Sequence, residues 1–552
     1  MQQLKALQQF VQLIFSHFRW KILLILLFGV LLSFFQGVSI VMIIPLLESF
    51  KNGTRSPFAK VMQSLDLELS MEGILLLYFG VLLLFAFFKA LQILFTQRTI
   101  AQFSNKFNIE SIEVLLKANW EFFLKVPSSE LINLLKTEAR SVRTLTHQFF
   151  QVVQNIILII IQLIFACFIS WQLTLFLCLV LGALFALQRF VFKRNYHLGQ
   201  GQIGIGESLQ KYLSETFRGI KLLKLHQLEG NRSEEYKDRI IALEENELKK
   251  AKVDAMSDLL YTLSGALIVI AIIYVSIKFN LLSMASLLVL LVLFSRVISQ
   301  VNSMVKTTGF ISNMLPSFTK FNQVLTLAKS HTPKKSDKLV AQEIRSIELK
   351  NIHFSFGEKQ ILKGINVRFE KGKFYVLTGA SGVGKTITSD LICGLVTPAS
   401  GEIVINDKVR SADELRTFQA STSYVLQDTV LFGASIKANI TFFENYSDEE
   451  VLYAAQLAGL QPLLDKLPQG LDTLVKEDNR GFSGGEMQRI SIARALIRKT
   501  PLIILDEVTN ALDRKNEEII IATLNQIKQN SIVILITHKE YLFDLADEVV
   551  RL

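Results

Sequence analysis

Residues 379–386 read Gly-Ala-Ser-Gly-Val-Gly-Lys-Thr, which fits the pattern G-x-x-x-x-G-K-[ST] at every fixed position. The apolar run Phe374–Thr378 comes directly before this stretch, and a helix is expected to begin near Lys385. A strand, a glycine-rich loop and a helix in this order form a cradle for phosphate, because the N–H groups of the loop and of the helix N-terminus face the phosphate oxygens. The stretch therefore predicts an α/β domain that binds a nucleotide.

The residues of this stretch have separate expected roles. Lys385 is placed to neutralise the β- and γ-phosphates of ATP, and the hydroxyl of Thr386 is a candidate ligand for Mg²⁺. The backbone of the loop supplies further contacts to phosphate. The residues expected to bind the nucleotide here are Gly379, Ala380, Ser381, Gly382, Val383, Gly384, Lys385 and Thr386.

Two acidic residues follow another apolar run, at Leu502–Leu505. A carboxylate at the end of a buried strand is costly without a cation, so Asp506 is predicted to bind Mg²⁺. Glu507 comes next and is a candidate for the base that polarises the water attacking the γ-phosphate. The alternative for Glu507 is an ordinary surface salt bridge.

From Ile347 onward, short β-rich runs alternate with helical ones, which predicts an α/β domain with a largely parallel central sheet. A polar stretch without periodicity, residues 331–338, precedes this domain and is predicted to be a linker. The strongest predicted strands are Phe374–Thr378, Ser423–Val425, Leu502–Leu505 and Ile532–Thr537.

The first part of the chain is far more apolar than the core of a soluble protein requires. Half of the 552 residues are hydrophobic, and they concentrate before about residue 310. Because roughly 20 apolar residues in a helix cross a bilayer, this part predicts six spans. The predicted spans are 21–47, 73–97, 149–170, 172–193, 257–278 and 281–304.

The charges between the spans predict the topology. Lys and Arg cluster in the long stretches 98–148 and 193–255, so the positive-inside rule places these stretches and both termini in the cytoplasm. The same placement explains the net charge of +10 better than binding to nucleic acid does. The loop at about 48–72 is then external, and its sequon Asn52-Gly-Thr54 is interpreted as a chance match.

With the motif Phe482-Ser-Gly-Gly-Glu486 added, residues 345–552 resemble the nucleotide-binding domain of an ATP-binding cassette (ABC) transporter. Residues 1–325 resemble an exporter-type transmembrane domain, and residues 326–344 form the linker between the two. The resemblance covers nearly the whole chain. It implies an ATP hydrolase that drives export or flipping of a cargo, with ATP and Mg²⁺ as cofactors.

The resemblance also implies roles for residues that the spacing alone does not assign. By position, Phe356 matches the aromatic residue that stacks on adenine, where the family usually has Tyr. Gln427 matches the glutamine that senses Mg²⁺ and the attacking water, and His538 matches the histidine that holds the γ-phosphate and the glutamate in register. Ser483, Gly484 and Gly485 match the signature that contacts ATP held by the opposite subunit, and Asp513 matches the loop that crosses the dimer seam.

Three positions depart from the family pattern. Phe482 and Glu486 replace the first and last residues of the usual signature Leu-Ser-Gly-Gly-Gln, and Asn510 replaces a usual Ser. The Ser and both Gly of the signature are kept, so function is expected, with altered affinity as one outcome. The replacement at Asn510 is interpreted as minor.

Because the family sandwiches each ATP between two subunits, the resemblance implies a dimer. Glu507 and His538 are both present, which favours a homodimer over half of a heterodimeric multidrug or peptide exporter. The coupling helices of the family are expected near Lys117–Val126 and Tyr212–Lys221. An ATP-gated channel or regulator is the alternative from another functional class. The expected location is a bacterial-type cytoplasmic membrane.

Intramembrane polar residues are the only candidates for recognising the cargo. Lys89 and Arg296 are functional candidates by default, with snorkelling to the membrane edge as the alternative. If they face the cavity, they favour an anionic or amphipathic cargo such as a lipid, a lipid-linked precursor or a peptide. The other polar candidates are Gln148, Gln151, Asn155 and Gln162 in the third span and Ser299, Gln300 and Ser303 in the sixth.

Two further expectations concern small features. Leu4, Leu7, Val11, Ile14 and Phe18 recur at helical spacing and predict an amphipathic helix, either in the membrane interface or packed on the protein. The three cysteines have neither metal-ligand spacing nor a disulfide pattern, so free buried thiols are expected. These are Cys167, Cys178 and Cys393.

Overall fold

The computed structural model describes residues 2–44, 71–333, 343–476 and 481–552, so the predicted external loop and its sequon lie almost wholly outside the described residues. The chain divides into two compact units. The first, called the helical unit, comprises residues 1–118 and 125–330. The second, called the nucleotide unit, comprises residues 119–124 and 331–552. Each unit is described by itself.

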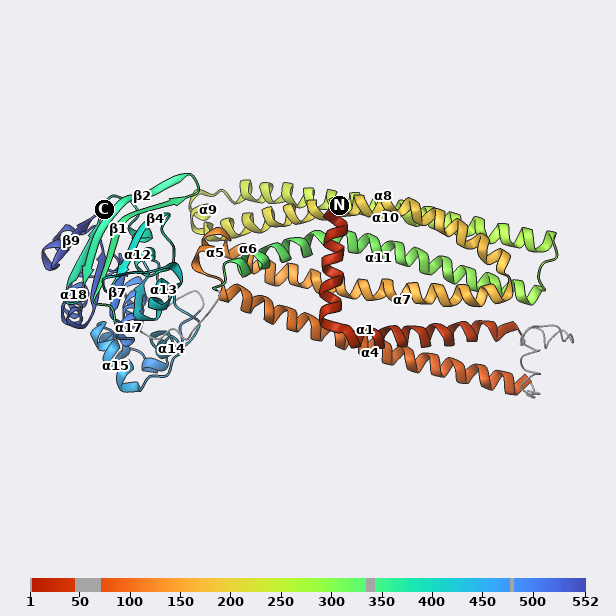
Figure 1. The fold of residues 1–552 in the computed structure, drawn as a ribbon, viewed down its shortest axis with the longest axis horizontal. Helices are drawn as coiled ribbons and strands as arrows, with labels where there is room; N and C mark the ends of the chain where they lie inside the picture. The colour runs from red at the N-terminus through yellow and green to blue at the C-terminus, as the bar shows by residue number, and fades with distance from the viewer. Residues whose placement is uncertain (1, 45–70, 334–342, 477–480) are drawn as a thin grey trace. The chain divides into compact units, whose positions relative to one another are not determined.

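Six helices within the described residues are long and apolar enough to cross a membrane, and each contains all or most of one of the predicted spans. Figure 1 shows that they run along one another, except for the first part of α1, which is drawn across the direction of the others. Such helices satisfy every backbone hydrogen bond internally, as a bilayer demands. They are α1 (Gln2–Val41), α4 (Met71–Lys117), α7 (Ala139–Ile169), α8 (Trp171–Arg218), α10 (Glu229–Lys278) and α11 (Met284–Ser330).

Two tight turns join four of these helices. Ser170 alone separates α7 from α8, and its extended backbone (φ −157°) reverses the chain. The turn between α10 and α11 contains Asn280 at φ 48°, a left-handed conformation that Asn tolerates better than most residues. Short helices complete this unit, namely α6 (Ser128–Asn133), the π-helical turn η1 (Leu134–Glu138) and α9 (Ile220–His226), while α5 (Trp120–Lys125) lies largely in the nucleotide unit.

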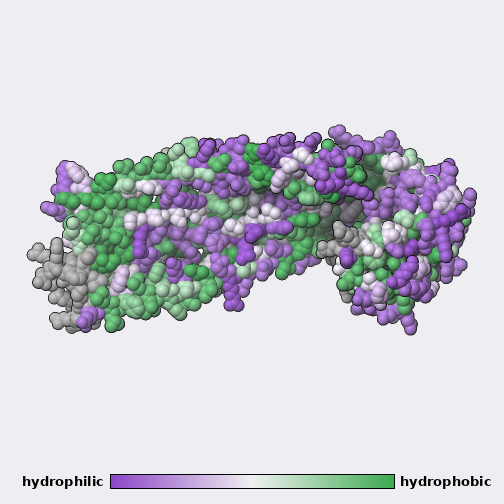
Figure 2. All heavy atoms as spheres, turned by 180° about the vertical axis from the view of Figure 1, so that it is seen from behind, coloured by the Kyte–Doolittle hydropathy of each residue, from purple (hydrophilic) through white to green (hydrophobic). Residues whose placement is uncertain are grey.

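Helix α11 is the packing centre of the helical unit and contacts α1, α4, α7, α8 and α10. Its residues Leu290, Leu293, Phe294 and Val297 are fully buried among apolar side chains of the neighbouring helices. The helix continues to Ser330, so residues 326–330 of the stretch predicted as linker are helical. Apolar side chains cover much of the outer surface of the unit, as Figure 2 shows and as lipid contact requires.

The N-terminal amphipathic segment is the first part of α1 and packs on the helical unit. Phe10 is fully buried and makes edge contacts with Phe149 and Phe318, at ring-centroid distances of 6.1 and 5.3 Å. Ile14 is also buried, whereas Leu4 is 67% exposed. The buried face is therefore rotated from the predicted one, because the large Phe10 ring takes the inward position.

The nucleotide unit contains two sheets within the described residues. A parallel sheet has the strand order β6-β7-β8-β3-β9, and an antiparallel sheet has the order β2-β1-β4-β5. The four predicted strands are all present and lie in the parallel sheet, which confirms the predicted fold class. The strands are β1 (Ser346–Phe356), β2 (Lys359–Glu370), β3 (Phe374–Thr378), β4 (Ser400–Ile405), β5 (Lys408–Val409), β6 (Thr422–Val425), β7 (Leu502–Asp506), β8 (Ile532–Ile536) and β9 (Glu548–Arg551).

Helices cover both faces of the parallel sheet, which explains why β3, β7 and β8 are continuous apolar runs. One face packs on α14, α15, α17 and α18, and the other packs on α12, α13 and the antiparallel sheet. The helices are α12 (Lys385–Ile392), α13 (Ala412–Thr417), α14 (Ile436–Thr441), α15 (Asp448–Leu457), α16 (Gln461–Leu464), α17 (Gly484–Ile497) and α18 (Arg514–Ile527), with short 3₁₀ turns η2 (Phe418–Ser421), η3 (Gly470–Asp472), η4 (Lys528–Asn530) and η5 (Glu540–Leu545).

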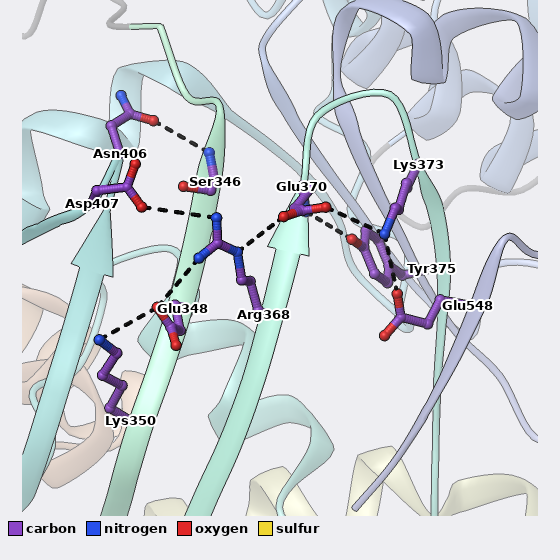
Figure 3. A network of polar contacts seen from close by, with 10 residues as sticks. All are labelled: Ser346, Glu348, Lys350, Arg368, Glu370, Lys373, Tyr375, Asn406, Asp407 and Glu548. Carbon is purple, nitrogen blue, oxygen red and sulfur yellow. Dashed lines mark hydrogen bonds and ion pairs between the residues drawn. The ribbon is translucent and has the colours of Figure 1, made fainter.

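A surface network of charges connects the two sheets (Figure 3). Arg368 on β2 contacts Glu370 at 3.0 Å and reaches Glu348 on β1 at 3.8 Å. Lys373 then joins Glu370, at 3.3 Å, to Glu548 on β9, at 3.6 Å. Each exposed ion pair of this kind contributes little to stability. The buried apolar side chains therefore hold the two sheets together, and the ion pairs only link their edges at the surface.

Close packing of α8 on α11 generates a test of the helical fold. A Cβ atom at Gly199 would lie 2.1 Å from the carbonyl oxygen of Asn313, whereas nothing lies within 4 Å of a Cβ at Gly204 in the same helix. Gly199→Ala should therefore destabilise the protein by about 1–3 kcal/mol through overpacking. Gly204→Ala should be neutral or stabilise it by up to about 1 kcal/mol through helix propensity.

Thermal unfolding of the full-length variants in detergent measures both effects. The midpoint of Gly199→Ala should fall below that of the wild type, and the midpoint of Gly204→Ala should not. Equal midpoints for the two variants would contradict the packing of α8 on α11.

Candidate nucleotide site

The glycine-rich loop runs from the end of β3 to the start of α12. Gly382 and Gly384 have φ values of 80° and 107°, which side-chain-bearing residues rarely adopt. A Cβ at Gly384 would also lie 2.4 Å from the Leu362 side chain. Glycine is thus required here for backbone conformation and for space. The loop keeps the strand-loop-helix geometry that the sequence predicts for phosphate binding.

Lys385, the first residue of α12, turns its side chain back over the loop. Its ammonium group donates hydrogen bonds to the carbonyl oxygens of Gly379 and Ala380, at 3.0 and 3.1 Å. The Lys385 side chain is only 8% exposed, so its positive charge has lost most of the water that would hydrate it in solution. The arrangement concentrates positive charge at the loop, where a phosphate group would lie.

Asp506 ends β7 as a buried carboxylate. Burial raises the pKa of Asp506 above its ordinary value, while hydrogen bonds from Tyr424 and Thr386 lower the pKa in part. The Tyr424 hydroxyl donates to Oδ2 of Asp506 at 3.1 Å. A buried carboxylate that is oriented by a neighbouring hydroxyl and lies beside Thr386 has the hard oxygen donors that Mg²⁺ prefers.

Glu507 follows Asp506 but has a left-handed backbone, with φ 50°, which directs its side chain away from the strand. Three side chains converge on its carboxylate. Gln427 donates from Nε2 to Oε2 at 2.9 Å, and Nε2 of His538 lies 3.3 Å from Oε1. Asn510 donates from Nδ2 to Oε2 at 3.0 Å. The structure thus brings together Glu507, Gln427 and His538, which are far apart in sequence.

Asn510 is a site residue whose importance the sequence analysis missed. The replacement of the usual Ser was interpreted as minor, yet the Asn510 amide holds the Glu507 carboxylate. The available signal was its position three residues after Glu507, within reach across a turn. The backbone N–H of Asn510 also donates to the carbonyl of Glu507, at 3.2 Å, so the turn itself fixes the contact.

The signature residues form the N-terminus of α17. Ser483 is the N-cap, and Glu486 completes a capping box, in which the Ser483 N–H donates to the Glu486 carboxylate at 2.7 Å. A Cβ at Gly485 would lie 2.8 Å from the carbonyl oxygen of Ala511, so only glycine fits. The replacement of the usual Gln by Glu486 therefore keeps a capping side chain at this position.

The other two predicted contact residues lie at the ends of elements. Phe356 ends β1, is 44% exposed and makes an edge contact with Phe354, which leaves part of its ring accessible for stacking. Asp513 is the N-cap of α18, where Oδ1 accepts from the N–H of Asn516 at 2.8 Å. The hydrogen bonds of Ser483 and Asp513 thus go to their own helices.

A further buried carboxylate, Asp390, lies in the last turn of α12. Burial raises the pKa of Asp390 to about 6, against a lowering effect of the hydrogen bond from Trp120. The neighbouring Glu121 accepts hydrogen bonds from the N–H and the hydroxyl of Thr397, at 3.1 and 2.7 Å. Residues 119–124 are thus anchored beside the C-terminal end of the helix that begins at the loop.

The sequence analysis did not single out Asp390. The signal was a lone acidic residue directly before the apolar Leu391 and Ile392 in a short helix. Because helical spacing alone does not tell which face is buried, the pattern could not identify its partner, Trp120, which is distant in sequence.

The intramembrane polar candidates have different surroundings in the helical unit. Lys89 and Arg296 are exposed in the single chain, and Lys89 lies over the Phe85 ring at 5.8 Å. Gln162 is fully buried. Ser299 lines a cleft between α10 and α11, to which Arg296 does not contribute. The charges that the sequence analysis proposed for the cargo therefore lie outside this cleft.

The cysteines only partly match the expectation of free buried thiols. All three are free, but Cys167 and Cys178 are exposed in the single chain and only Cys393 is buried. The first two occupy spans, where lipid replaces protein as the apolar surroundings. Burial raises the pKa of Cys393 well above its usual range, which keeps this thiol neutral. No cluster of potential metal ligands of the His, Cys, Asp and Glu type occurs in the described ranges.

Comparison with known protein families agrees with this geometry. Residues 11–301 match the family described as ABC transporter transmembrane region, and residues 362–510 match the family described as ABC transporter. The chain belongs to the ABC transporter family. It is an ABC exporter with the transmembrane region and the ATPase domain fused, and its ATPase is coupled to transport.

Several curated relatives of this ABC exporter cover most of its length. The heterocyst differentiation ATP-binding protein HepA of Nostoc sp. is 27% identical, over 97% of this chain and 90% of the relative. The ATP-dependent lipid A-core flippase of Syntrophus aciditrophicus is 26% identical, over 85% of this chain and 78% of the relative. The Escherichia coli flippase of the same name is also 26% identical, over 69% and 66%.

A solved structure shares the fold of the exporter. A bacterial Atm1-family ABC exporter with ATP bound superposes with a TM-score of 0.81 and 19% sequence identity, over 98% of this chain and 94% of the other. The likeness extends over both units, so the fusion of a transmembrane region to an ATPase domain is confirmed as the architecture of the chain.

The buried carboxyl of Asp390 generates a pH-dependent stability prediction. Its folded pKa of about 6 exceeds the ordinary value, so the folded state binds a proton more tightly than the unfolded state does. Stability is therefore lost as pH rises from about 4 to about 6, and the loss persists above that range. Asp390→Asn removes the ionisable group and should raise the thermal midpoint at pH 7.5 by more than at pH 5.

The expected gain in stability is roughly 1 kcal/mol greater at pH 7.5 than at pH 5. Asp413→Asn, at a side chain that is 85% exposed, serves as the control and should shift the midpoint little at either pH. A gain for Asp390→Asn that is the same at both pH values would show that the burial of this carboxyl does not control its titration.

Proposed function

We propose that this exporter moves an amphiphilic cargo across the membrane and that two copies of the chain sandwich each ATP. The observation that supports the proposal best is the convergence of Gln427, Asn510 and His538 on Glu507. This geometry orients a single carboxylate beside the phosphate-binding loop. A general base needs such positioning for hydrolysis.

Each side chain of the site then has a role. Glu507 accepts the proton of the attacking water, and Gln427 and His538 hold the carboxylate in position. Lys385 neutralises charge that develops on the phosphates. Bound Mg²⁺ would supply charge neutralisation between the phosphate groups, and Thr386, Gln427 and Asp506 are the residues that would hold it.

The role of the signature supports a dimer. The N-terminus of α17 presents the Ser483 side chain and the N–H groups of Gly484 and Gly485, a suitable site for the γ-phosphate of a nucleotide on the partner. Because Glu507 and His538 are both present, each copy has the residues for a competent site. A homodimer is therefore the proposed assembly, and a heterodimer is the alternative.

Residues 119–124 are the proposed coupling segment. Trp120 and Glu121 contact Asp390 and Thr397, at the end of the helix whose first residue is Lys385. A shift of α12 on nucleotide binding would be felt directly at this segment. The second expected coupling region, Tyr212–Lys221, contains the break at Gly219 between α8 and α9.

A lipid or a lipid-linked molecule is the proposed cargo class. The names of the related lipid A-core flippases support a lipid, and the exposed apolar helices give such a molecule lateral access. The proposed location is a bacterial-type cytoplasmic membrane with both termini in the cytoplasm, on the distribution of Lys and Arg. A peptide cargo and an ATP-gated channel remain the alternatives that transport assays would distinguish.

A complementation experiment tests the composite site. Lys385→Ala and Ser483→Arg should each abolish ATP hydrolysis alone. When the two variants are co-expressed, mixed dimers contain one site with an intact loop and an intact signature. Activity should therefore return to about a quarter of the wild-type value, because about half of the dimers are mixed and each has one working site. The measurement is ATP hydrolysis by the purified mixture in lipid nanodiscs.

Two controls accompany this experiment. Glu507→Gln should bind ATP but fail to hydrolyse it, and co-expression of Lys385→Ala with itself should give no recovery. A mixture that stays inactive would refute the shared site, and a wild-type chain without any hydrolysis would refute the homodimer.

The hydroxyl of Tyr424 generates a prediction about Mg²⁺. Tyr424→Phe removes the donor to Asp506 and should raise the Mg²⁺ concentration for half-maximal ATP hydrolysis by about tenfold, since groups that orient metal ligands commonly have effects of this size. Tyr375→Phe is the matched control, because its hydroxyl accepts from the N–H of Glu370 instead. Equal Mg²⁺ dependence of the two variants would argue against Asp506 as a ligand.

A further inference from the structure

A cleft of about 510 Å³ lies between the neighbouring helices α10 and α11 of the helical unit. Residues of α11 that line it recur at helical spacing, namely Ser295, Ser299 and Asn302, and Thr262 faces them from α10. These side chains place three hydroxyls and one amide along one strip of wall. The strip lies in spans, where polar side chains are rare unless they have a function.

Asn302 has one hydrogen-bonding atom to spare. Its Nδ2 donates to Oδ1 of Asp258 at 2.7 Å, which fixes the orientation of the amide. Its Oδ1 is buried and has no hydrogen-bond partner among the described residues. A buried acceptor without a partner is unfavourable, so a small movement of the Asn302 side chain that exposes this oxygen to the cleft would let a ligand hydroxyl or N–H satisfy it.

The charges next to the cleft compensate each other. Lys306, one helical turn beyond Asn302, places Nζ 2.8 Å from Oδ1 of Asp258. Neither of these two residues lines the cleft, and every side chain that does line it is uncharged. An anionic head group would require a cation without a partner, and a cationic one would require a free carboxylate. The wall therefore favours an uncharged head group that forms many hydrogen bonds.

Most of the remaining lining is apolar, and the hydroxyl of Tyr261, which also lines the cleft, donates to the carbonyl oxygen of Leu184 at 3.4 Å. Ala266, Val269, Ile270 and Ile298 continue the wall beyond the polar strip. A Cβ at Gly265 would lie 2.8 Å from Cγ2 of Ile298, so the absence of a side chain at Gly265 allows the two helices to approach at the cleft. A free sugar would leave this apolar wall unused, whereas a lipid chain would cover it.

We propose that the cleft between α10 and α11 binds the cargo, and that the cargo is a glycolipid with an uncharged, hydroxyl-rich head group. The inference rests on the proposed export of an amphiphile and names its chemical class. The hydroxyls and the Asn302 amide bind the head group, and the apolar wall receives the start of a hydrocarbon chain. The Lys306–Asp258 pair lies beside the cleft, holds the Asn302 amide and adds no net charge.

Lipid-stimulated ATP hydrolysis tests this assignment. The full-length protein is placed in phosphatidylcholine nanodiscs that contain either monogalactosyldiacylglycerol or phosphatidylglycerol at equal amounts, or that receive free methyl galactoside. The galactolipid should stimulate hydrolysis by at least about twofold, as a ligand that favours one state of a two-state transporter does. Phosphatidylglycerol and the free sugar should stimulate it less.

Two matched variants locate the effect. Ser299→Val removes a hydroxyl from the cleft and should abolish the stimulation by galactolipid. Ser303→Val makes the same change at an exposed serine of α11 outside the cleft and should keep the stimulation.

Asp258→Asn leaves Lys306 without its carboxylate and should shift the preference toward phosphatidylglycerol.

The outcomes separate this inference from the proposed function. Equal or greater stimulation by phosphatidylglycerol, equal stimulation by the free sugar, or an equal loss in both serine variants would overturn the glycolipid assignment while leaving export intact. Absence of ATP hydrolysis by the wild type under every lipid condition would instead overturn the proposed function. Stimulation by galactolipid that is lost only in Ser299→Val supports both.

Discussion

The nucleotide unit depends on the placement of two adjacent carboxylates at the end of a buried parallel strand. Strand β7 supplies Asp506 in its last position, and the left-handed backbone at Glu507 turns the next side chain in another direction. The carboxylate of Asp506 is thereby buried, an environment that favours a bound cation. The carboxylate of Glu507 lies where the side chains of Gln427, Asn510 and His538 hold it. The neighbouring strands β6 and β8 fix both positions, because Tyr424 is on β6 and His538 follows β8.

The helical unit obeys a different constraint. A bilayer offers no hydrogen bonds, so the long helices satisfy their own backbone, and several polar side chains find partners where two helices meet. Asn302 and the pair Asp258–Lys306 illustrate this rule, since they bind one another between α10 and α11. Close approach at Gly199 and Gly265 shows that small residues, as much as large apolar ones, set how these helices pack.

Much of this architecture could be predicted from the sequence, because the decisive signals are local. The length of apolar runs predicted the six spans, and the strand Phe374–Thr378 followed by a glycine-rich loop predicted the phosphate cradle. The contacts that hold the site together are not local. Trp120, the partner of Asp390, becomes visible only when the chain is folded, since it has no periodic or motif signal for this role. Asn510 is the exception, because it lies three residues from Glu507 and the turn brings the two side chains together.

The orientation of side chains around long helices was the other limit of prediction. Arg296 and Ser299 are three residues apart and are both predicted candidates for recognising the cargo, yet Ser299 lines the cleft and Arg296 does not. The buried face of α1 likewise differs from the predicted one and is centred on Phe10. The Phe10 ring fills the space between α7 and α11, whereas Leu4 is exposed.

Substitutions from the family pattern can preserve a function by a different hydrogen bond. Glu486 replaces a usual Gln, but its carboxylate caps the helix that Ser483 begins. A carboxylate at a helix N-terminus also opposes the approach of phosphate to the same N–H groups, whereas a neutral amide does not. The capping box reduces this conflict, because it commits the Glu486 oxygens to the Ser483 N–H at 2.7 Å. Glu486 therefore keeps the N-terminal cap of α17. Its added negative charge would lower the affinity of the signature for phosphate.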